Sequence, residues 1–456
     1  MIVKQFYLEC LSHASYLVAD EATKRAIVVD PRRDIAEYLD EANRHGLLIE
    51  GVINTHFHAD FVSGHLEFAA ATGAWIAFGA NADTDYPIRR LHHGDHISLG
   101  DVDVEILSTP GHTWESISLL LRESADASPS VVLTGDSLFI GDVGRPDLAN
   151  LGGSSNTDLA RAMYATLHQI LLRLPDDVAV MPAHGAGSSC GKNLSTELVS
   201  TIGEQRRTNY SLQPMTEDEF VNLITTGQPA IPGYFAADAD LNRREHPVFD
   251  ATQELPELSP EQFRAHQSTE HTVTIDIRSP EKFAAAHLSG SVNVGLVGRF
   301  AETCGMVAGA GDAIMLVAGP GDAPEAVRRL ARIGFDKVIG YLPVTEPTGF
   351  PQSLSDLVVH ADRVEPQELS DLLDIDAVAV LDVRNSSERE AGHIDGSLHI
   401  PLPELLARQG EVPQDRPVVV HCQSGWRSSV AASLLRAHGR QPVTDLKGGY
   451  AAWMEV

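Results

Sequence analysis

The stretch Thr55-His56-Phe57-His58-Ala59-Asp60-Phe61 decides the fold of the N-terminal part of this chain. It follows the apolar run 51–54, which predicts a β-strand. Two imidazoles and a carboxylate therefore stand on a loop at the carboxyl end of a strand, where α/β proteins build their sites. The last position is a phenylalanine, and a phenyl ring has no lone pair for a metal ion. The loop predicts a metal site to which position 61 contributes no ligand.

Three more motifs of the same kind follow in order. Residues 109–113 (Thr-Pro-Gly-His-Thr) carry His112 on a turn. Residues 134–139 place Asp136 just after the apolar run 131–133, and residues 181–185 place His184 after another strand-like run. A single histidine among the 20 in the chain would mean little. Four spaced motifs, each on a turn or at a strand end, predict that their side chains meet at one metal centre.

The His-x-His-x-Asp-His pattern resembles the metal loop of the metallo-β-lactamase superfamily, up to its last letter. Dinuclear members carry a histidine for a second metal there, where this chain has Phe61. The resemblance implies an αββα fold with His56, His112 and Asp136 as ligands. Two neutral nitrogens and one carboxylate are the set typical of non-heme Fe(II) sites that activate oxygen. We therefore expect one Fe(II) per chain.

The persulfide dioxygenases of this superfamily share a second mark, a Gly-Arg-x-Asp-Phe segment after the aspartate ligand. Residues 144–148 (Gly-Arg-Pro-Asp-Leu) resemble it, with leucine for phenylalanine. Two roles are open for Arg145: it binds the charged part of a thiol substrate, or it fixes its own loop by pairing with Asp147. His58, Asp60 and His184 are expected to orient ligands or bound water.

The segment after His184 contains Cys190. Two interpretations stay open for this thiol. It contacts a persulfide or forms a mixed persulfide in the metal pocket, or it is a small residue in a tight loop. The start signals Asn193, Ser195 and Glu197 predict a helix directly afterwards.

The C-terminal half repeats itself. Asp276-Ile277-Arg278 and the later His287 recur 106 residues downstream as Asp382-Val383-Arg384 and His393. The repeated pattern resembles the first signature of rhodanese domains. The fold class expected is α/β, an αββα domain followed by two rhodanese-like domains with central parallel sheets. The expected domain limits are 1–250, 255–352 and 360–456, with proline-rich linkers around 229–260 and 343–351.

In the last copy, an apolar run leads into Cys422-Gln423-Ser424-Gly425-Trp426-Arg427-Ser428, which resembles the active loop of rhodaneses. A cysteine at a helix N-terminus, beside an arginine and inside a cup of backbone N–H groups, has its thiolate stabilised, and the same cup can hold a persulfide. Four residues separate Cys422 from Arg427, whereas phosphatase loops have five, so sulfur is favoured over phosphate. Cys422 and Arg427 are the expected catalytic pair, and the expected persulfide-binding loop is Gln423, Ser424, Gly425, Trp426 and Ser428.

The middle copy lacks a nucleophile at this place. The offset of 106 residues puts Leu316 opposite Cys422, and a gap of one residue puts Val317 there. Neither side chain can carry sulfur, and Asp322 lies near where an arginine is needed. We expect an inactive copy that serves as a spacer, a docking surface or a wall of the metal pocket.

The composition of the chain limits the classes of partner that it is expected to bind. The chain has 456 residues, 34 basic and 63 acidic, and a net charge of −29, which argues against nucleic acid or an anionic membrane as partner. Neither a signal peptide nor a bilayer-spanning run is expected. Four cysteines cannot form a disulfide framework, so a reducing cytoplasm is the expected location. A homo-oligomer is compatible with these features.

The resemblance implies a persulfide dioxygenase fused to a sulfurtransferase. Its expected partners are a small thiol persulfide (of glutathione, coenzyme A or a similar thiol), O2, sulfite and thiosulfate. Two other functions stay open at this point. One is a zinc-dependent, glyoxalase II-like thioester hydrolase with an accessory sulfurtransferase, and the other is a non-catalytic sulfur-carrier protein.

Overall fold

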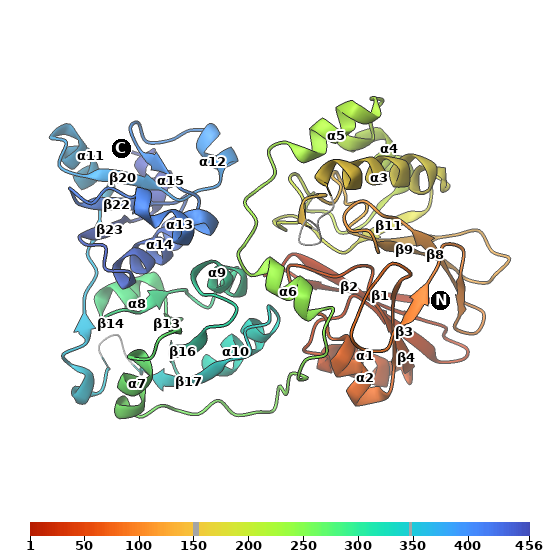
Figure 1. Ribbon diagram of the computed structural model, residues 1–456, viewed down its shortest axis with the longest axis horizontal. Helices are drawn as coiled ribbons and strands as arrows, with labels where there is room; N and C mark the ends of the chain where they lie inside the picture. The colour runs from red at the N-terminus through yellow and green to blue at the C-terminus, as the bar shows by residue number, and fades with distance from the viewer. Residues whose placement is uncertain (149–154, 346–348) are drawn as a thin grey trace. The chain divides into compact units, whose positions relative to one another are not determined.

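The computed structural model describes residues 1–148, 155–345 and 349–456, and the chain forms two compact units (Figure 1). Unit 1 comprises Met1–Ile231, Phe235–Ala251 and Arg332–Gly334, and unit 2 comprises Pro232–Tyr234, Thr252–Ala331 and Phe335–Val456. Residues 149–154 of the predicted first domain and 346–348 of the predicted 343–351 linker lie outside the described residues. No helix in the described ranges combines the length and apolar character that crossing a bilayer requires.

Unit 1 contains two six-stranded sheets. In spatial order the first consists of β1 (Ile2–Leu8), β2 (His13–Ala19), β3 (Arg25–Val29), β4 (Leu48–Ile53), β5 (Trp75–Gly79) and β6 (Arg89–Leu91). The second consists of β12 (Ser200–Thr201), β11 (Ala179–Pro182), β10 (Val131–Gly135), β9 (Ile117–Arg122), β8 (Asp103–Ser108) and β7 (His96–Ser98). The helices are α1 (Ala36–His45), α2 (His65–Thr72), α3 (Asn156–Gln169), α4 (Ile202–Thr208), α5 (Glu217–Thr225) and α6 (Phe235–Leu241).

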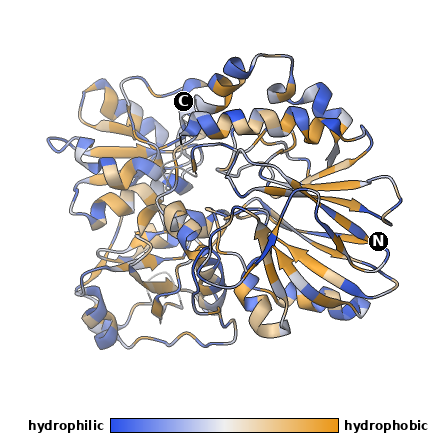
Figure 2. Ribbon diagram, turned by 45° about the vertical axis from the view of Figure 1, so that its right-hand side comes forward, coloured by the Kyte–Doolittle hydropathy of each residue, from blue (hydrophilic) through white to orange (hydrophobic). Residues whose placement is uncertain are grey.

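The two sheets of unit 1 pack face to face and helices cover their outer faces. One buried cluster joins side chains of both sheets, including Val18 and Ile53 from the first and Leu119 from the second. A second cluster packs α1 and α2 on the first sheet, and a third packs α3 and α5 on the other. In Figure 2 the strands are mostly hydrophobic, whereas the helices mix hydrophobic and hydrophilic residues. The predicted αββα fold is confirmed.

The predicted metal ligands follow from this architecture because their loops leave strand ends. The loop that begins at Asn54 follows β4, Asp136 follows β10 directly, and His184 comes two residues after β11. His112 lies on the connection between β8 and β9. The helix predicted after Asn193 is absent: residues 191–199 form bends and irregular backbone, and α4 begins only at Ile202.

The described residues of unit 2 form two larger sheets whose strands all run parallel, as predicted, and one antiparallel pair of short strands. The middle copy has the strand order β15 (Val292–Asn293), β13 (Thr272–Asp276), β16 (Ala313–Ala318) and β17 (Val338–Pro343), with helices α7 (Pro260–Gln267), α8 (Pro280–Ala285), α9 (Phe300–Val307) and α10 (Ala323–Ala331). The short strands β14 (His287–Leu288) and β18 (Val358–Val359) pair with each other.

The last copy has a five-stranded sheet. Its strand order is β19 (Arg363–Val364), β23 (Val443–Leu446), β22 (Val418–His421), β20 (Ala379–Asp382) and β21 (Leu398–His399). Its helices are α11 (Pro366–Asp374), α12 (Ser386–Glu390), α13 (Leu402–Arg408), α14 (Trp426–Ala437) and α15 (Gly449–Trp453).

Strand pairing aligns the two copies better than sequence spacing does. In the middle copy Asp276 pairs with Val317 on the neighbouring strand. In the last copy Asp382 pairs with His421 in the same way. The residues that follow, Ala318 and Cys422, are therefore equivalent. The middle copy has two extra residues between its signatures, so neither Leu316 nor Val317 occupies the cysteine position. The expected absence of a nucleophile there holds, because alanine has no reactive group.

Gly64 offers a test of how the loops around the metal site pack. A Cβ at this position would lie 2.1 Å from the carbonyl oxygen of Arg32, which is a backbone atom and cannot swing away. We expect Gly64→Ala to lower the free energy of unfolding by about 1–3 kcal/mol, as overpacking does. Thermal unfolding would measure the loss, with Gly311→Ala as control because a Cβ there would meet no atom within 4 Å. Equal melting temperatures for the two variants would contradict the prediction.

Candidate metal centre and sulfur-transfer loop

Three buried side chains, His56, His112 and Asp136, bring their ligand atoms together within 4.8 Å of one another. Nε2 of His56 lies 3.8 Å, and Nε2 of His112 lies 3.6 Å, from Oδ2 of Asp136. Among the described residues, neither Nε2 of His56 nor Oδ2 of Asp136 has a hydrogen-bond partner. Buried acceptors without donors are costly unless a cation binds them. These residues therefore fit a metal ion, as the motifs predict.

Neighbouring groups fix the tautomers of both histidines. Nδ1 of His112 lies 2.8 Å from the carbonyl oxygen of Arg145, which can only accept, so this nitrogen carries the proton. Thr55 donates its hydroxyl to Asp30 at 2.8 Å, so Nδ1 of His56, at 3.0 Å, donates to the hydroxyl oxygen. In both rings Nε2 is left with its lone pair toward the site.

His184 links two carboxylates. Its Nδ1 lies 2.8 Å from Oδ1 of Asp136 and its Nε2 lies 2.7 Å from Oδ2 of Asp60. Burial alone would lower the pKa of His184, but Asp136 and Asp60 outweigh it and raise the pKa well above its ordinary value. Both nitrogens then donate, and the imidazolium has no lone pair for a metal. His184 thus connects Asp60 to Asp136 by two hydrogen bonds.

Phe61 and His58 lie beside the three ligands, outside their set. The ring of Phe61 is fully buried and packs on His58 at 4.3 Å between centroids and on His13 at 4.1 Å. His58 also packs on His56 at 4.2 Å. Phe61 thus fills this side of the cluster with a buried ring that offers no lone pair to a metal ion.

The side chain of Arg145 is engaged with its own loop. Two of its nitrogens bind both carboxylate oxygens of Asp147, at 2.6 and 2.7 Å, and a third donates to the carbonyl oxygen of Ser189 at 3.1 Å. The residue is 1% exposed. Of the two roles left open, this geometry favours the loop-fixing pair. The backbone carbonyl oxygen of Arg145 accepts a hydrogen bond from His112, and this is the more direct contribution of Arg145 to the centre.

Cys190 is buried beside the centre. Its sulfur and the ligand atoms of Asp60 and His184 form a second group within 4.8 Å. Burial raises the pKa of this thiol well above its ordinary value, and Asp60 and Asp136 raise it further. A buried thiol beside two carboxylates is a poor environment for a thiolate. Since both nitrogens of His184 are occupied, this second group lacks the donors for another ion.

Sequence reasoning missed two residues that support the centre. Asp30, at the end of β3, accepts from Thr55 and so orients His56. Asn242 comes from the predicted linker, yet it donates to the carbonyl oxygens of His58 and Phe61 at 2.8 Å each. In the sequence, the only sign of a role for Asp30 was its position after an apolar strand. Nothing in the sequence indicated a role for Asn242.

The predicted sulfur-transfer loop lies between β22 and α14. The backbone N–H of Gly425 donates to Sγ of Cys422 at 3.2 Å, and the Ser428 hydroxyl lies 3.7 Å from the same sulfur. Gly425 has φ +96°, a left-handed conformation that favours glycine. The N-cap residue of α14 thus points its N–H at the sulfur, which favours an anion there. Gln423 and Ser424 are the exposed residues of the loop.

Arg427 is held by a partner that sequence reasoning did not identify. Its guanidinium binds both carboxylate oxygens of Glu388, at 2.6 and 2.7 Å. Burial would raise the pKa of Glu388, but the Arg427 guanidinium holds it below its ordinary value. Both side chains remain about one quarter exposed, so an anionic substrate can compete for Arg427.

Comparisons with known proteins agree with this organisation. A family model described as the rhodanese-like domain matches residues 259–342 and 365–456. A metallo-beta-lactamase from Staphylococcus aureus has a similar solved structure, with 33% identity and a TM-score of 0.68, over 75% of this chain and 98% of that one. The match thus extends beyond unit 1.

Curated relatives resemble the N-terminal part. The human mitochondrial persulfide dioxygenase ETHE1 is 26% identical over 49% of this chain and 80% of its own length. A hydroxyacylglutathione hydrolase of Polaromonas is 36% identical over 40% of this chain and 66% of its own length. The chain spans only about half of several other relatives, 54–57%. This chain belongs to the metallo-β-lactamase superfamily and is a fusion of that fold with two rhodanese-like domains.

Proposed function

We propose that the N-terminal domain oxidises a small thiol persulfide to sulfite with one Fe(II), and that Cys422 transfers sulfane sulfur to form or use thiosulfate. The observation that carries the first half is the donor set: two imidazole nitrogens and one carboxylate, with phenylalanine at the position of a second-metal ligand. Oxygen-activating iron uses this set, whereas dinuclear hydrolysis needs two ions. Similarity to a persulfide dioxygenase supports the same assignment.

The surrounding residues have separate tasks in this proposal. Bound Fe(II) would supply the activation of O2 that the side chains cannot provide. Thr55 and the Arg145 carbonyl group keep both histidines as neutral ligands, and His184 holds Asp136 from behind. Phe61 keeps water from the adjoining space. Overall, a persulfide, O2 and water give a thiol, sulfite and protons, with both atoms of O2 and one oxygen of water in the sulfite.

The last copy would handle the sulfane sulfur. In the proposed transfer, the Cys422 thiolate takes the outer sulfur of thiosulfate and releases sulfite, or the Cys422 persulfide gives its outer sulfur to sulfite. The Gly425 N–H and the Ser428 hydroxyl stabilise the charge on Cys422 in either direction. Because both sites are in one chain, sulfite and persulfide reach each other at high effective concentration.

A second candidate is a zinc thioester hydrolase with an accessory sulfurtransferase. The similarity to a hydroxyacylglutathione hydrolase favours it. Phe61 and the engaged nitrogens of His184 weigh against the second metal ion that this chemistry needs. Metal analysis together with oxygen uptake on glutathione and coenzyme A persulfides separates the two candidates.

We expect the purified protein to hold about one iron per chain, and His112→Ala or Asp136→Ala to lose the iron. Oxygen uptake with a persulfide should disappear with it, while sulfur transfer from thiosulfate to cyanide persists. Elemental analysis and an oxygen electrode measure the outcome. Two equivalents of zinc with thioesterase activity and no oxygen uptake would contradict the dioxygenase.

Cys422→Ser should abolish transfer of sulfur from thiosulfate, because the equivalent residue of the middle copy is an alanine. Iron content and oxygen uptake should stay unchanged. Sulfite should then accumulate where the unmodified protein yields thiosulfate. The measurement is the ratio of sulfite to thiosulfate per O2 consumed, corrected for the spontaneous reaction of sulfite with persulfide. An unchanged ratio would show that the two sites are not coupled.

A further inference from the structure

Helix α14 of the last copy carries three buried serines: Ser428 faces Cys422, and Ser429 and Ser433 follow it among apolar residues. A buried hydroxyl is unfavourable without a hydrogen-bond partner. Ser429 and Ser433 have a partner outside the last copy, in Asn293 at the end of strand β15 of the middle copy. The inactive copy therefore contacts the helix that follows the active loop.

The polar groups of this contact have hydrogen-bond partners. Ser429 donates its hydroxyl to Oδ1 of Asn293 at 2.8 Å, and the backbone N–H of Asn293 donates to the Ser433 hydroxyl at 2.9 Å. Nδ2 of Asn293 donates to the carbonyl oxygens of Asp276 at 3.0 Å and Arg278 at 2.9 Å. Asn293 and the two serines are at most 4% exposed. Such a buried network holds its members in one arrangement.

The two copies differ at this position in an informative way. Asn293 lies opposite Asp276, and His399 lies opposite Asp382, so Asn293 and His399 are equivalent. Nε2 of His399 lies 2.8 Å from the carbonyl oxygen of Arg384, which repeats the bond from Asn293 to Arg278. Both residues brace the end of their own sheet. Only the asparagine adds an acceptor oxygen, and that oxygen binds Ser429.

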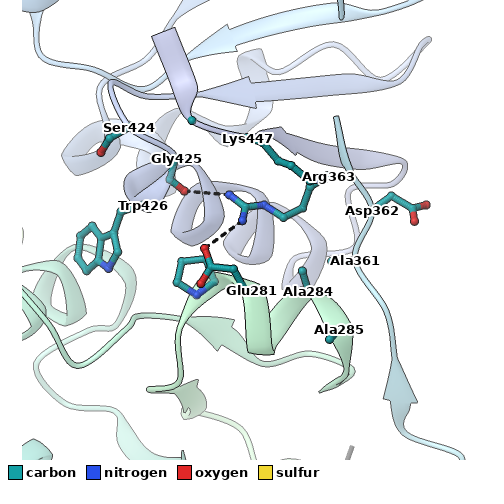
Figure 3. Close-up of a pocket in the computed structure, with 12 residues that line it drawn as sticks. Glu281, Ala284, Ala285, Ala361, Asp362, Arg363, Ser424, Gly425, Trp426 and Lys447 are labelled. Carbon is teal, nitrogen blue, oxygen red and sulfur yellow. Dashed lines mark hydrogen bonds and ion pairs between the residues drawn. The ribbon is translucent and has the colours of Figure 1, made fainter. Parts of the chain in front are cut away.

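Further contacts lie at the start of α14. A Cβ on Gly295 would lie 3.2 Å from Nε1 of Trp426, so the middle copy leaves room for this indole. Figure 3 shows Arg363 between the loop and the middle copy: its guanidinium lies 3.5 Å from the Gly425 carbonyl oxygen and 3.5 Å from the Glu281 carboxylate. Glu281, Arg363, Gly425 and Trp426 line a cavity of about 780 Å³.

We infer that Asn293 is a positioning residue for Cys422, so that the inactive copy sets the geometry of the active one. The inference rests on the proposed sulfur transfer. Ser428, whose hydroxyl faces Cys422, is adjacent to Ser429, so holding Ser429 fixes the rotation of α14 about its axis. The same rotation directs the Gly425 N–H to the sulfur. Without the Asn293 bond, both groups lose their alignment with Cys422.

The test uses the full-length protein with Asn293→Ala and Ser429→Ala. Each should lower kcat for sulfur transfer from thiosulfate to cyanide about tenfold, with KM for thiosulfate changed less than about twofold. Alkylation of Cys422 by iodoacetamide, followed by mass spectrometry of its peptide, should shift its pH midpoint upward. The double variant should be no worse than either single one. Ser429→Thr, which keeps the hydroxyl, should restore both readouts.

Ser291→Ala is the matched control, because Ser291 is buried near β15 and donates to Leu288 within the middle copy. It should lower the melting temperature without moving kcat or the alkylation profile. The inference is overturned if Asn293→Ala and Ser429→Ala behave like this control. If the unmodified protein transfers no sulfur, the proposed function fails, and the alkylation profiles alone decide the role of Asn293.

Discussion

The metal site depends on one arrangement: a buried imidazolium, His184, held between two carboxylates. It compensates negative charge that the low-dielectric interior would otherwise disfavour, and it aims the remaining oxygen of Asp136 at His56 and His112. Without this pair of hydrogen bonds, the buried carboxylates of Asp60 and Asp136 would lose the donor that they share.

The supporting residues come from distant parts of the chain. Asp30 acts through Thr55, the Arg145 carbonyl group acts on His112, and Asn242 closes the loop that carries His58 and Phe61. Each fixes a tautomer or a backbone direction. Segment 144–148 therefore contributes to the site through the Arg145 carbonyl group, although the Arg145 side chain binds its own loop.

Prediction from the sequence succeeded where a feature depends on residues that are neighbours in the chain. Apolar runs followed by histidine or aspartate indicated the sheets and the three side chains that meet in unit 1, and the repeated Asp-x-Arg motif indicated two parallel-sheet domains. It failed where contacts are distant. Asn242 stood in a stretch that was interpreted as a linker, and Glu388 gave no hint that it binds Arg427. The register of the middle copy was also misplaced, because two inserted residues between its signatures are invisible to a constant offset.

The alanine at position 318 sets the stoichiometry of the proposed sulfur transfer. With Ala318 where the last copy has Cys422, the two rhodanese-like loops offer one cysteine between them, so the proposed transfer has one persulfide position per chain. In that proposal each chain must release its sulfane sulfur before it takes the next. The rate of the whole chain would then follow the slower of the two proposed reactions.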